Sequence, residues 1–116
     1  MNISFEGIGC EVITVKKTST LKKGDLGYFK SDKTVAPATS SSGFDCKVVA
    51  VYEDGTASVQ VRGYIEAAYA SATPISGVGY QGIACASETV VAPNSSARKY
   101  LIISNDTVKH TVGILL

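Results

Sequence analysis

Short apolar runs and strict alternations of apolar and polar residues dominate the hydrophobic pattern of this chain. The clearest unit lies between Cys46 and Gly63, where two valine-rich stretches flank the turn sequence Glu53-Asp54-Gly55-Thr56. From Ala57 to Arg62 apolar and polar residues alternate, which predicts a strand with one buried face. We therefore expect a β-hairpin around an Asp-Gly turn.

Further strands are predicted on both sides of this hairpin. Their ranges are 9–16, 26–30 and 34–36 before it, and 64–69, 83–86, 89–91, 99–104 and 108–115 after it. Gly63 is expected to mark a bulge or a bend onto a second sheet, and residues 38–43 a surface loop. About eight to ten short strands at regular spacing predict an all-β fold, a single compact β-barrel or β-sandwich with little or no helix.

Composition and charge narrow the classes of function. The chain has 116 residues, of which 45% are hydrophobic and 18% charged, so a wholly disordered chain is excluded and one β domain over residues 9–116 is expected. The net charge of +1 gives no long-range attraction to nucleic acid or to an anionic membrane. The sequence has neither a membrane-length apolar run nor a secretory signal pattern, which predicts synthesis in a cytoplasm.

Residues that could carry chemistry are few and scattered. Cys10, Cys46 and Cys85 lack the spacing of metal ligands or of a disulfide framework, and each is expected to be a small buried hydrophobic residue. The single histidine, His110, falls in an alternating strand pattern, which favours a structural role. The sequence therefore predicts no catalytic, cofactor-binding or metal-binding residues, with thiol catalysis kept as the weakest alternative.

Glycines at positions 77, 79 and 82 spell the G-x-G-x-x-G pattern of dinucleotide-binding proteins. That pattern requires a helix directly after the glycines and an acidic residue about 20 positions further on. The short apolar stretch 83–86 and the proline at position 93 leave no room for such a helix. We expect ordinary use of glycine in β-turns here.

Three tyrosines, Tyr64, Tyr69 and Tyr80, cluster in the central segment without interleaved lysine or arginine. This arrangement differs from a groove for single-stranded nucleic acid, which combines aromatic residues with positive charge. Tyrosine is favoured at protein interfaces because it gives a large contact area with a polar end. The three residues are predicted to lie between subunits of a homo-oligomer or, as the alternative, in the core.

Several local patterns also occur in a characteristic order along the chain. They are Gly24-Asp25, Lys33 to Ala38, Val48 to Val51, Asp54 to Ile65, Gly79-Tyr80, Arg98 to Ile102 and Thr111 to Leu116. Together they resemble the small head decoration proteins, also called capsid cement proteins, of tailed bacteriophages and prophages of Gram-positive bacteria. The resemblance spans nearly the whole chain and rests on the order of elements.

The resemblance implies a non-enzymatic protein that binds the exterior of the expanded phage head and stabilises it by bridging capsomers. Its implied partner is the major capsid protein, and its implied state is a homo-oligomer, with a trimer favoured. No cofactor, nucleic acid or membrane is implied. Such a protein is made in the cytoplasm of the bacterial host and resides on the exterior of the virion head. The alternative function is a virion- or cell-surface β module that binds carbohydrate or a receptor.

The first residues of the chain alternate between polar and apolar side chains. Asn2, Ile3, Ser4 and Phe5 precede a pair of nearby glycines. One hypothesis makes residues 1–8 a flexible arm that adds to the capsid surface and buries Ile3 and Phe5. The other makes them a first strand of the barrel. Deletion of residues 2–6 separates the two hypotheses, because loss of shell binding at an unchanged melting temperature supports the arm.

Overall fold

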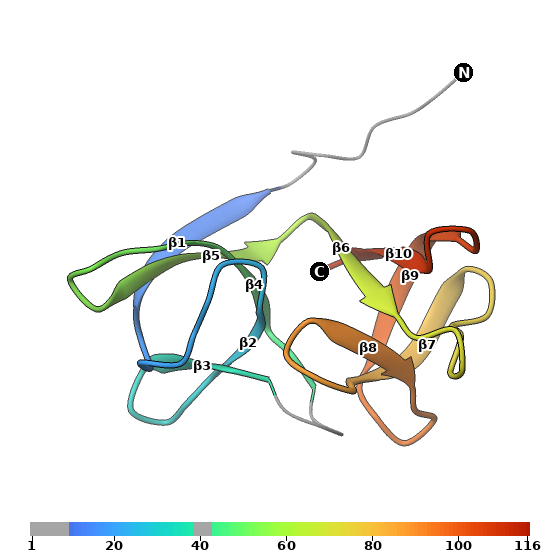
Figure 1. The fold of residues 1–116 in the computed structure, drawn as a ribbon, viewed down its shortest axis with the longest axis horizontal. Coiled ribbons are helices and arrows are strands. Elements are labelled where there is room, and N and C mark those ends of the chain that lie inside the picture. The colour runs from blue at the N-terminus through green and yellow to red at the C-terminus, as the bar shows by residue number, and fades with distance from the viewer. Residues whose placement is uncertain (1–9, 39–42) are drawn as a thin grey trace.

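The computed structural model describes residues 10–38 and 43–116. These residues contain ten strands joined by turns and loops, and no helix (Figure 1). In chain order the strands are β1 (Glu11–Lys17), β2 (Leu26–Phe29), β3 (Thr34–Pro37), β4 (Cys46–Val51), β5 (Thr56–Arg62), β6 (Tyr64–Tyr69), β7 (Gly79–Cys85), β8 (Val90–Pro93), β9 (Lys99–Asp106) and β10 (Thr111–Leu115). The predicted all-β class, the number of strands and the β4–β5 hairpin are confirmed.

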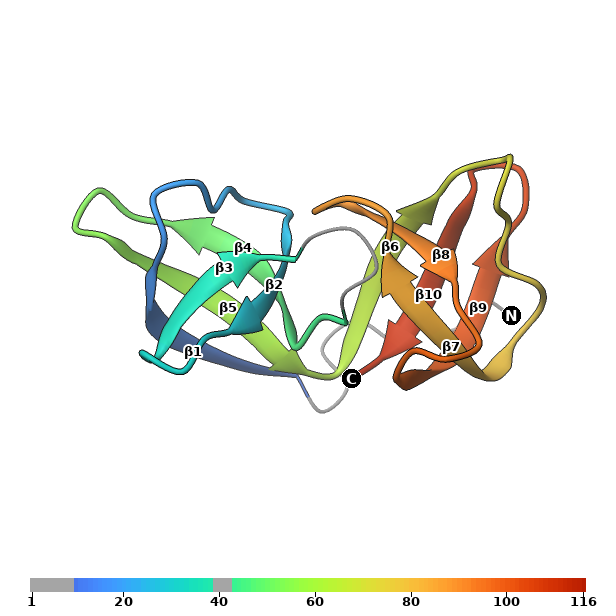
Figure 2. The same ribbon diagram turned by 90° about the horizontal axis from the view of Figure 1, so that it is seen from below.

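The strands close into two five-stranded barrels that lie side by side, where the sequence predicted one barrel or sandwich (Figure 2). Barrel 1 has the order β1-β3-β2-β4-β5, and barrel 2 has the order β6-β8-β7-β9-β10. Gly63 joins them with a φ of 96°, a left-handed conformation that glycine adopts without strain. The predicted bend onto a second sheet at Gly63 is confirmed.

The two barrels have the same topology. In each, the first strand runs parallel to the third and antiparallel to the fifth. The second strand pairs with the third and the fourth, and the fourth with the fifth, all antiparallel. Each barrel also has a break in register between its fourth and fifth strands, between Val48 and Ala50 in barrel 1 and between Gly113 and Ile114 in barrel 2. The chain therefore forms one five-stranded unit twice.

Strand register gives corresponding positions on the two barrels. A residue and its direct cross-strand neighbour share one face of a sheet. Neighbours that follow one another from strand to strand therefore form a row across the sheet. Row 1, on the outside of barrel 1, runs Leu26, Lys47, Gln60, Val12. Row 2, at the corresponding place on barrel 2, runs Tyr80, Leu101, Leu115, Tyr64. Corresponding places in the two barrels therefore hold side chains of different chemical character.

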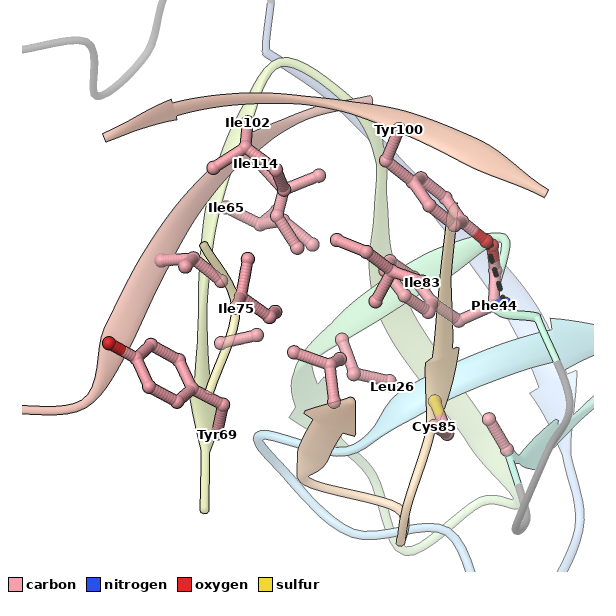
Figure 3. Close-up of a cluster of buried hydrophobic side chains, with 14 residues drawn as sticks. Leu26, Phe44, Ile65, Tyr69, Ile75, Ile83, Cys85, Tyr100, Ile102 and Ile114 are labelled. Atoms are coloured by element: carbon pink, nitrogen blue, oxygen red, sulfur yellow. Dashed lines mark hydrogen bonds between the residues drawn. The ribbon is translucent and has the colours of Figure 1, made fainter. Parts of the chain in front are cut away.

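Two clusters of buried side chains stabilise the barrels. The core of barrel 1 consists of Leu21, Val35, Cys46, Val48, Ala57 and Val59. The second cluster has 14 buried residues and fills barrel 2, yet Leu26 and Phe44 of barrel 1 belong to it (Figure 3). Because barrel 1 supplies part of the core of barrel 2, the two barrels pack as one body.

His110 lies in the turn before β10, so the predicted strand from Val108 is wrong at its start. Asp106 Oδ1 accepts hydrogen bonds from the backbone N–H groups of Val108 and Lys109, both at 3.0 Å, and these bonds close a turn. His110 then has a φ of 56°, and its ring contacts that of Tyr69 at 5.7 Å between centroids. The extended pairing of β10 begins only after this left-handed residue.

Candidate interaction surface

Row 1 is the surface through which barrel 1 holds barrel 2. Lys47 Nζ donates a hydrogen bond to the carbonyl oxygen of Glu66 at 2.6 Å, and Gln60 Nε2 donates one to the carbonyl oxygen of Tyr64 at 2.9 Å. Both carbonyls lie on the edge of β6 that β10 does not use, and β8 pairs with β6 only at residues 68 and 69. The polar side chains of row 1 therefore cover a free strand edge, which would otherwise expose unpaired backbone groups.

The position of Lys47 in this joint disfavours its charged form. Burial lowers the pKa of its ammonium group, and the nearby Glu66 carboxylate offsets only part of that shift. Next to it, the backbone N–H of Leu26 donates a hydrogen bond to the carbonyl oxygen of Glu88 at 2.7 Å. Polar contacts thus surround the apolar part of the joint.

An aromatic stack closes the joint on its other side. The rings of Phe44 and Tyr100 lie 4.3 Å apart between centroids and are parallel within 2° (Figure 3). The Tyr100 hydroxyl donates to the carbonyl oxygen of Phe44 at 2.8 Å and accepts from its N–H at 3.0 Å. Stacking and hydrogen bonding together fix the angle between the barrels at this point.

Arg98 connects the stack of Phe44 and Tyr100 to the charged side chain of Asp45. Its Nη2 forms an ion pair with Asp45 Oδ1 at 2.8 Å, and its Nε donates to the Tyr100 hydroxyl at 3.0 Å. Burial acts to lower the pKa of Arg98, but the hydrogen bonds with Asp45 and Tyr100 outweigh it and the pKa is raised. The guanidinium group therefore stays charged and serves as a structural link between the barrels.

Row 2 lies beside a depression that residues of both barrels line. Tyr80 is 74% exposed, and Leu101 and Leu115 are half-buried. The depression is open and has a volume of about 410 Å³, with Leu116 and Val61 adding to its apolar lining and Lys99 to its polar part. Exposed aromatic and aliphatic side chains with a polar rim are typical of protein–protein interfaces.

The edge of β1 is also open in the part of the chain that the structure describes. It corresponds to the β6 edge that row 1 covers, and β3 pairs with it only at residues 16 and 17. Over the preceding residues, Val12 is 47% and Ile13 38% exposed. An unpaired strand edge with exposed apolar side chains is a template on which another chain can add.

The three predicted interface tyrosines lie in different surroundings. Tyr80 is exposed in row 2, and Tyr64 is partly buried at the other end of that row, with its hydroxyl 3.2 Å from Ser104 Oγ. Tyr69 is only 5% exposed, and its hydroxyl donates to Asn105 Oδ1 at 3.0 Å. Tyr69 is therefore a core residue, as the alternative stated, because its strand turns that face into barrel 2.

The four residues predicted to contact a capsid, Asn2, Ile3, Ser4 and Phe5, lie outside the described residues. The hypothesis of a capsid-binding arm stays a prediction.

The three cysteines divide into two classes. Burial raises the pKa of Cys46 to about 12, with a further contribution from the charge of Asp45, and burial raises the pKa of Cys85 to about 11. Both groups are protonated at neutral pH and belong to the cores, as predicted. Cys10 is exposed, so the prediction of a buried residue is wrong there, because this residue precedes β1 and has no sheet over it.

The G-x-G-x-x-G glycines belong to a strand and the turn before it. No helix follows these glycines, as expected. Only Gly77 lies in the bend before β7, whereas Gly79 begins the strand and Gly82 lies within it, so the prediction of β-turn glycines is wrong for these two. In residues 10–38 and 43–116 no three potential metal ligands come together. Over the same ranges, no helix has the length and apolar character needed to cross a membrane.

Comparison of the chain with protein-family models, with curated proteins and with solved structures finds no match. Function is therefore argued from the surfaces described above and from the resemblance seen in the sequence.

Proposed function

We propose that this protein is a non-enzymatic capsid decoration protein that binds the exterior of an expanded phage head and stabilises it by bridging capsomers. The observation that carries the proposal is the apolar part of row 2, in which Tyr80 is exposed and Leu101 and Leu115 are half-buried, at the place where barrel 1 uses its own row to hold barrel 2. The resemblance supplies the class of partner, the major capsid protein. The acting unit in this proposal is a homo-oligomer, with a trimer favoured.

A decoration role requires a rigid body with several contact surfaces. The shared core of the two barrels supplies rigidity, and row 2 and the edge of β1 supply two surfaces. With a net charge of +1, binding has to come from shape and apolar contact instead of long-range attraction. Modest affinity at each contact is enough, because contacts held on one oligomer act together.

Co-sedimentation with phage heads that lack the protein tests this proposal. We expect saturable binding at a fixed ratio to the major capsid protein, with preference for mature, expanded heads over unexpanded proheads. A Val108→Lys variant, altered at a side chain that is 87% exposed outside both surfaces, is the matched control and should bind normally. Absence of binding to either particle contradicts the proposal.

One observation favours the alternative, a carbohydrate- or receptor-binding module. A polar depression of about 510 Å³ lies on barrel 2, and Tyr64, Glu66, Asp106 and Lys109 are among its lining residues. An aromatic ring beside carboxylate and hydroxyl groups suits a sugar, which offers both apolar faces and hydrogen-bonding edges. Glycan binding that disappears in a Glu66→Ala variant, together with absent head binding, would support this function.

A further inference from the structure

The edge of β1 that faces away from β5 has backbone groups that no described strand pairs with. The backbone N–H of Lys17 donates to the carbonyl oxygen of Gly55, the residue before β5, at 3.0 Å. Successive residues of a strand direct their backbone groups to opposite sides, so those of Val12 and Thr14 point away from β5. On that side β3 pairs with β1 only at residues 16 and 17. Both groups of both residues are therefore open within the described part of the chain.

The corresponding edge on barrel 2 is covered. There the carbonyl oxygens of Tyr64 and Glu66 accept hydrogen bonds from side chains of row 1 at 2.9 and 2.6 Å. Val12 and Tyr64 are the last members of the two rows and correspond to each other, as do Thr14 and Glu66 two positions further along. The β1 edge thus needs donors for its carbonyls and acceptors for its N–H groups, and another strand supplies both.

We propose that β1 of one molecule pairs in the antiparallel direction with β1 of a second copy, around a two-fold axis at Ile13. The open stretch runs from Glu11 to Val15, because β3 begins to pair at residue 16. Placed antiparallel against itself, this stretch has Ile13 opposite Ile13 of the second copy. The inference goes beyond the proposed function, since it names a contact between two copies of the protein that involves no capsid.

This register satisfies the open backbone groups of both molecules. Val12 of each copy lies opposite Thr14 of the other, in a pair in which each N–H donates to the carbonyl oxygen of the opposite residue. Every N–H and carbonyl group that points outward between residues 11 and 15 then has a partner. The edge is therefore complementary to itself in its hydrogen bonding.

The side chains of β1 favour the antiparallel direction. The strand begins with Glu11 and ends with Lys16 and Lys17. Antiparallel pairing brings the acidic start of one strand near the basic end of the other, whereas parallel pairing brings lysines beside lysines. Val12 is 47% and Ile13 38% exposed, so a second strand also covers apolar surface on both faces of the sheet.

The contact closes at two copies. A patch that meets itself around a two-fold axis is isologous, so no further copy adds to it. The inference is therefore separate from the trimer that the resemblance favours. One short strand from each molecule makes a small interface, and we expect weak association that is seen at high protein concentration.

Disulfide cross-linking tests the position of the two-fold axis. All variants carry Cys10→Ser, which removes the exposed thiol, whereas Cys46 and Cys85 are buried. Residues that face each other without hydrogen bonds in an antiparallel pair have Cα atoms about 4.5 Å apart, within the range of a disulfide. Ile13→Cys should therefore form a covalent dimer under mild oxidation. Val108→Cys is the matched control, because its side chain is 87% exposed and lies outside β1, and it should cross-link much more slowly.

Two further cysteine variants test the register. In the proposed pairing, position 12 lies opposite position 14, and each of these positions is about 7–8 Å from its own equivalent in the second copy. That separation exceeds the reach of a disulfide. A mixture of Val12→Cys and Thr14→Cys should therefore cross-link faster than either variant alone. Faster cross-linking of either variant with itself would overturn the proposed pairing.

Substitution of Thr14 tests the backbone pairing itself. Thr14→Pro removes the outward N–H, and proline is tolerated on an edge strand where that N–H makes no bond within the sheet. Thr14→Ala keeps the N–H and is the control, and melting temperatures verify that both variants fold. In sedimentation velocity we expect the proline to raise the dissociation constant of the dimer about tenfold or more relative to the alanine. Equal dissociation constants for the two variants would contradict backbone pairing at this edge.

A wild type that stays monomeric at every concentration overturns the inference, as does cross-linking of Ile13→Cys no faster than that of Val108→Cys. The assays contain no phage heads, so their outcome is independent of the proposed function. Head binding by a protein that does not pair through β1 removes only the inference. Pairing through β1 without head binding removes only the decoration role.

Discussion

Barrels 1 and 2 follow the same path with cores of unequal size. Barrel 1 has six buried core residues, of which the largest is a leucine. Barrel 2 contributes five isoleucines to a cluster of 14 and still uses Leu26 and Phe44 from barrel 1. One topology can therefore be stabilised by different side chains. The sharing runs in one direction, because every residue of the smaller cluster comes from barrel 1.

Of the changes considered, removal of a core residue that both barrels share should lower the stability of the protein most. Phe44→Ala deletes the ring that stacks on Tyr100, and we expect it to lower the free energy of unfolding by about 3–5 kcal/mol. Urea unfolding followed by circular dichroism measures the loss. Phe29→Ala, at a ring that is 39% exposed, is the control and should change stability much less. Equal effects of the two substitutions would show that the barrels do not depend on a common core.

An exchange of corresponding residues sharpens the comparison. Gly113 in barrel 2 corresponds to Ser58 in barrel 1, and a Cβ at Gly113 would lie 2.3 Å from both Tyr64 Cε2 and Ser104 Oγ. Gly113→Ser should therefore destabilise the protein by about 1–3 kcal/mol through overpacking. Tyr64→Val, which places the barrel 1 residue there, should remove the part of that loss that the ring causes in the double variant, as measured by a double-mutant cycle, and the contact with Ser104 Oγ should leave the remainder. Simple additivity of the two changes would contradict this reason for the glycine.

Loss of a hydrogen bond in the joint between the barrels should have a smaller effect on stability. Lys47→Leu places the row 2 residue in row 1 and removes the hydrogen bond to the carbonyl oxygen of Glu66. The expected loss is about 1 kcal/mol in the free energy of unfolding at neutral pH. Lys47→Arg, which keeps a donor, is the control in the same urea titration. A stability gain in the leucine variant would mean that the edge of β6 needs no covering donor.

The same lysine gives a dependence on pH with a definite sign. Burial lowers the pKa of Lys47 in the folded state below its ordinary value of 10.5, so the unfolded chain binds more protons between the two values. In that alkaline window the contribution of Lys47 makes stability rise with pH. Melting temperatures from neutral pH upward should show this rise in wild type relative to Lys47→Leu. A fall in the difference would reverse the assigned sign.

The smallest expected effect is seen in the reactivity of the buried thiols, of which each barrel has one. Cys46 and Cys85 are buried in separate cores, whereas Cys10 is exposed. Iodoacetamide at neutral pH should modify one thiol in the native protein and all three in denaturant. With rising urea both buried thiols should become reactive together, because the barrels form one body. Earlier modification of either thiol would show that its barrel opens by itself.

Local features of the fold could be predicted from the sequence because their signals are local. Alternation and an Asp-Gly turn indicate the β4–β5 hairpin, and a glycine between two strands indicates the bend at Gly63. The division into two barrels has no such signal. It depends on the parallel pairs β1–β3 and β6–β8, each of only two residue pairs between distant segments.

The internal repeat is hidden because corresponding core positions differ in size. Cys46 of barrel 1 corresponds to Tyr100 of barrel 2, and Ala57 to Val112. The third strands keep a visible trace, since 34–37 reads TVAP and 90–93 reads VVAP. That pair of motifs is the signal that could have predicted the repeat.

The candidate surface was only partly predictable for a related reason. Tyr69 and Tyr80 both lie in strands, and the sequence of a strand alone does not say which of its faces turns into a barrel. Closure of β6 against β8 puts Tyr69 inside, whereas Tyr80 remains on the outside of β7. Rows 1 and 2 come into view only when the strand registers of both barrels are compared.

Hydrogen–deuterium exchange at low and high protein concentration tests the central claim most directly, that row 2 and the β1 edge are association surfaces whereas row 1 is an internal joint. We predict that higher concentration slows exchange in residues 11–17 and 99–102 and leaves 105–110 and 66–69 unchanged. Exchange that is independent of concentration, or slowed only in other segments, would contradict the account.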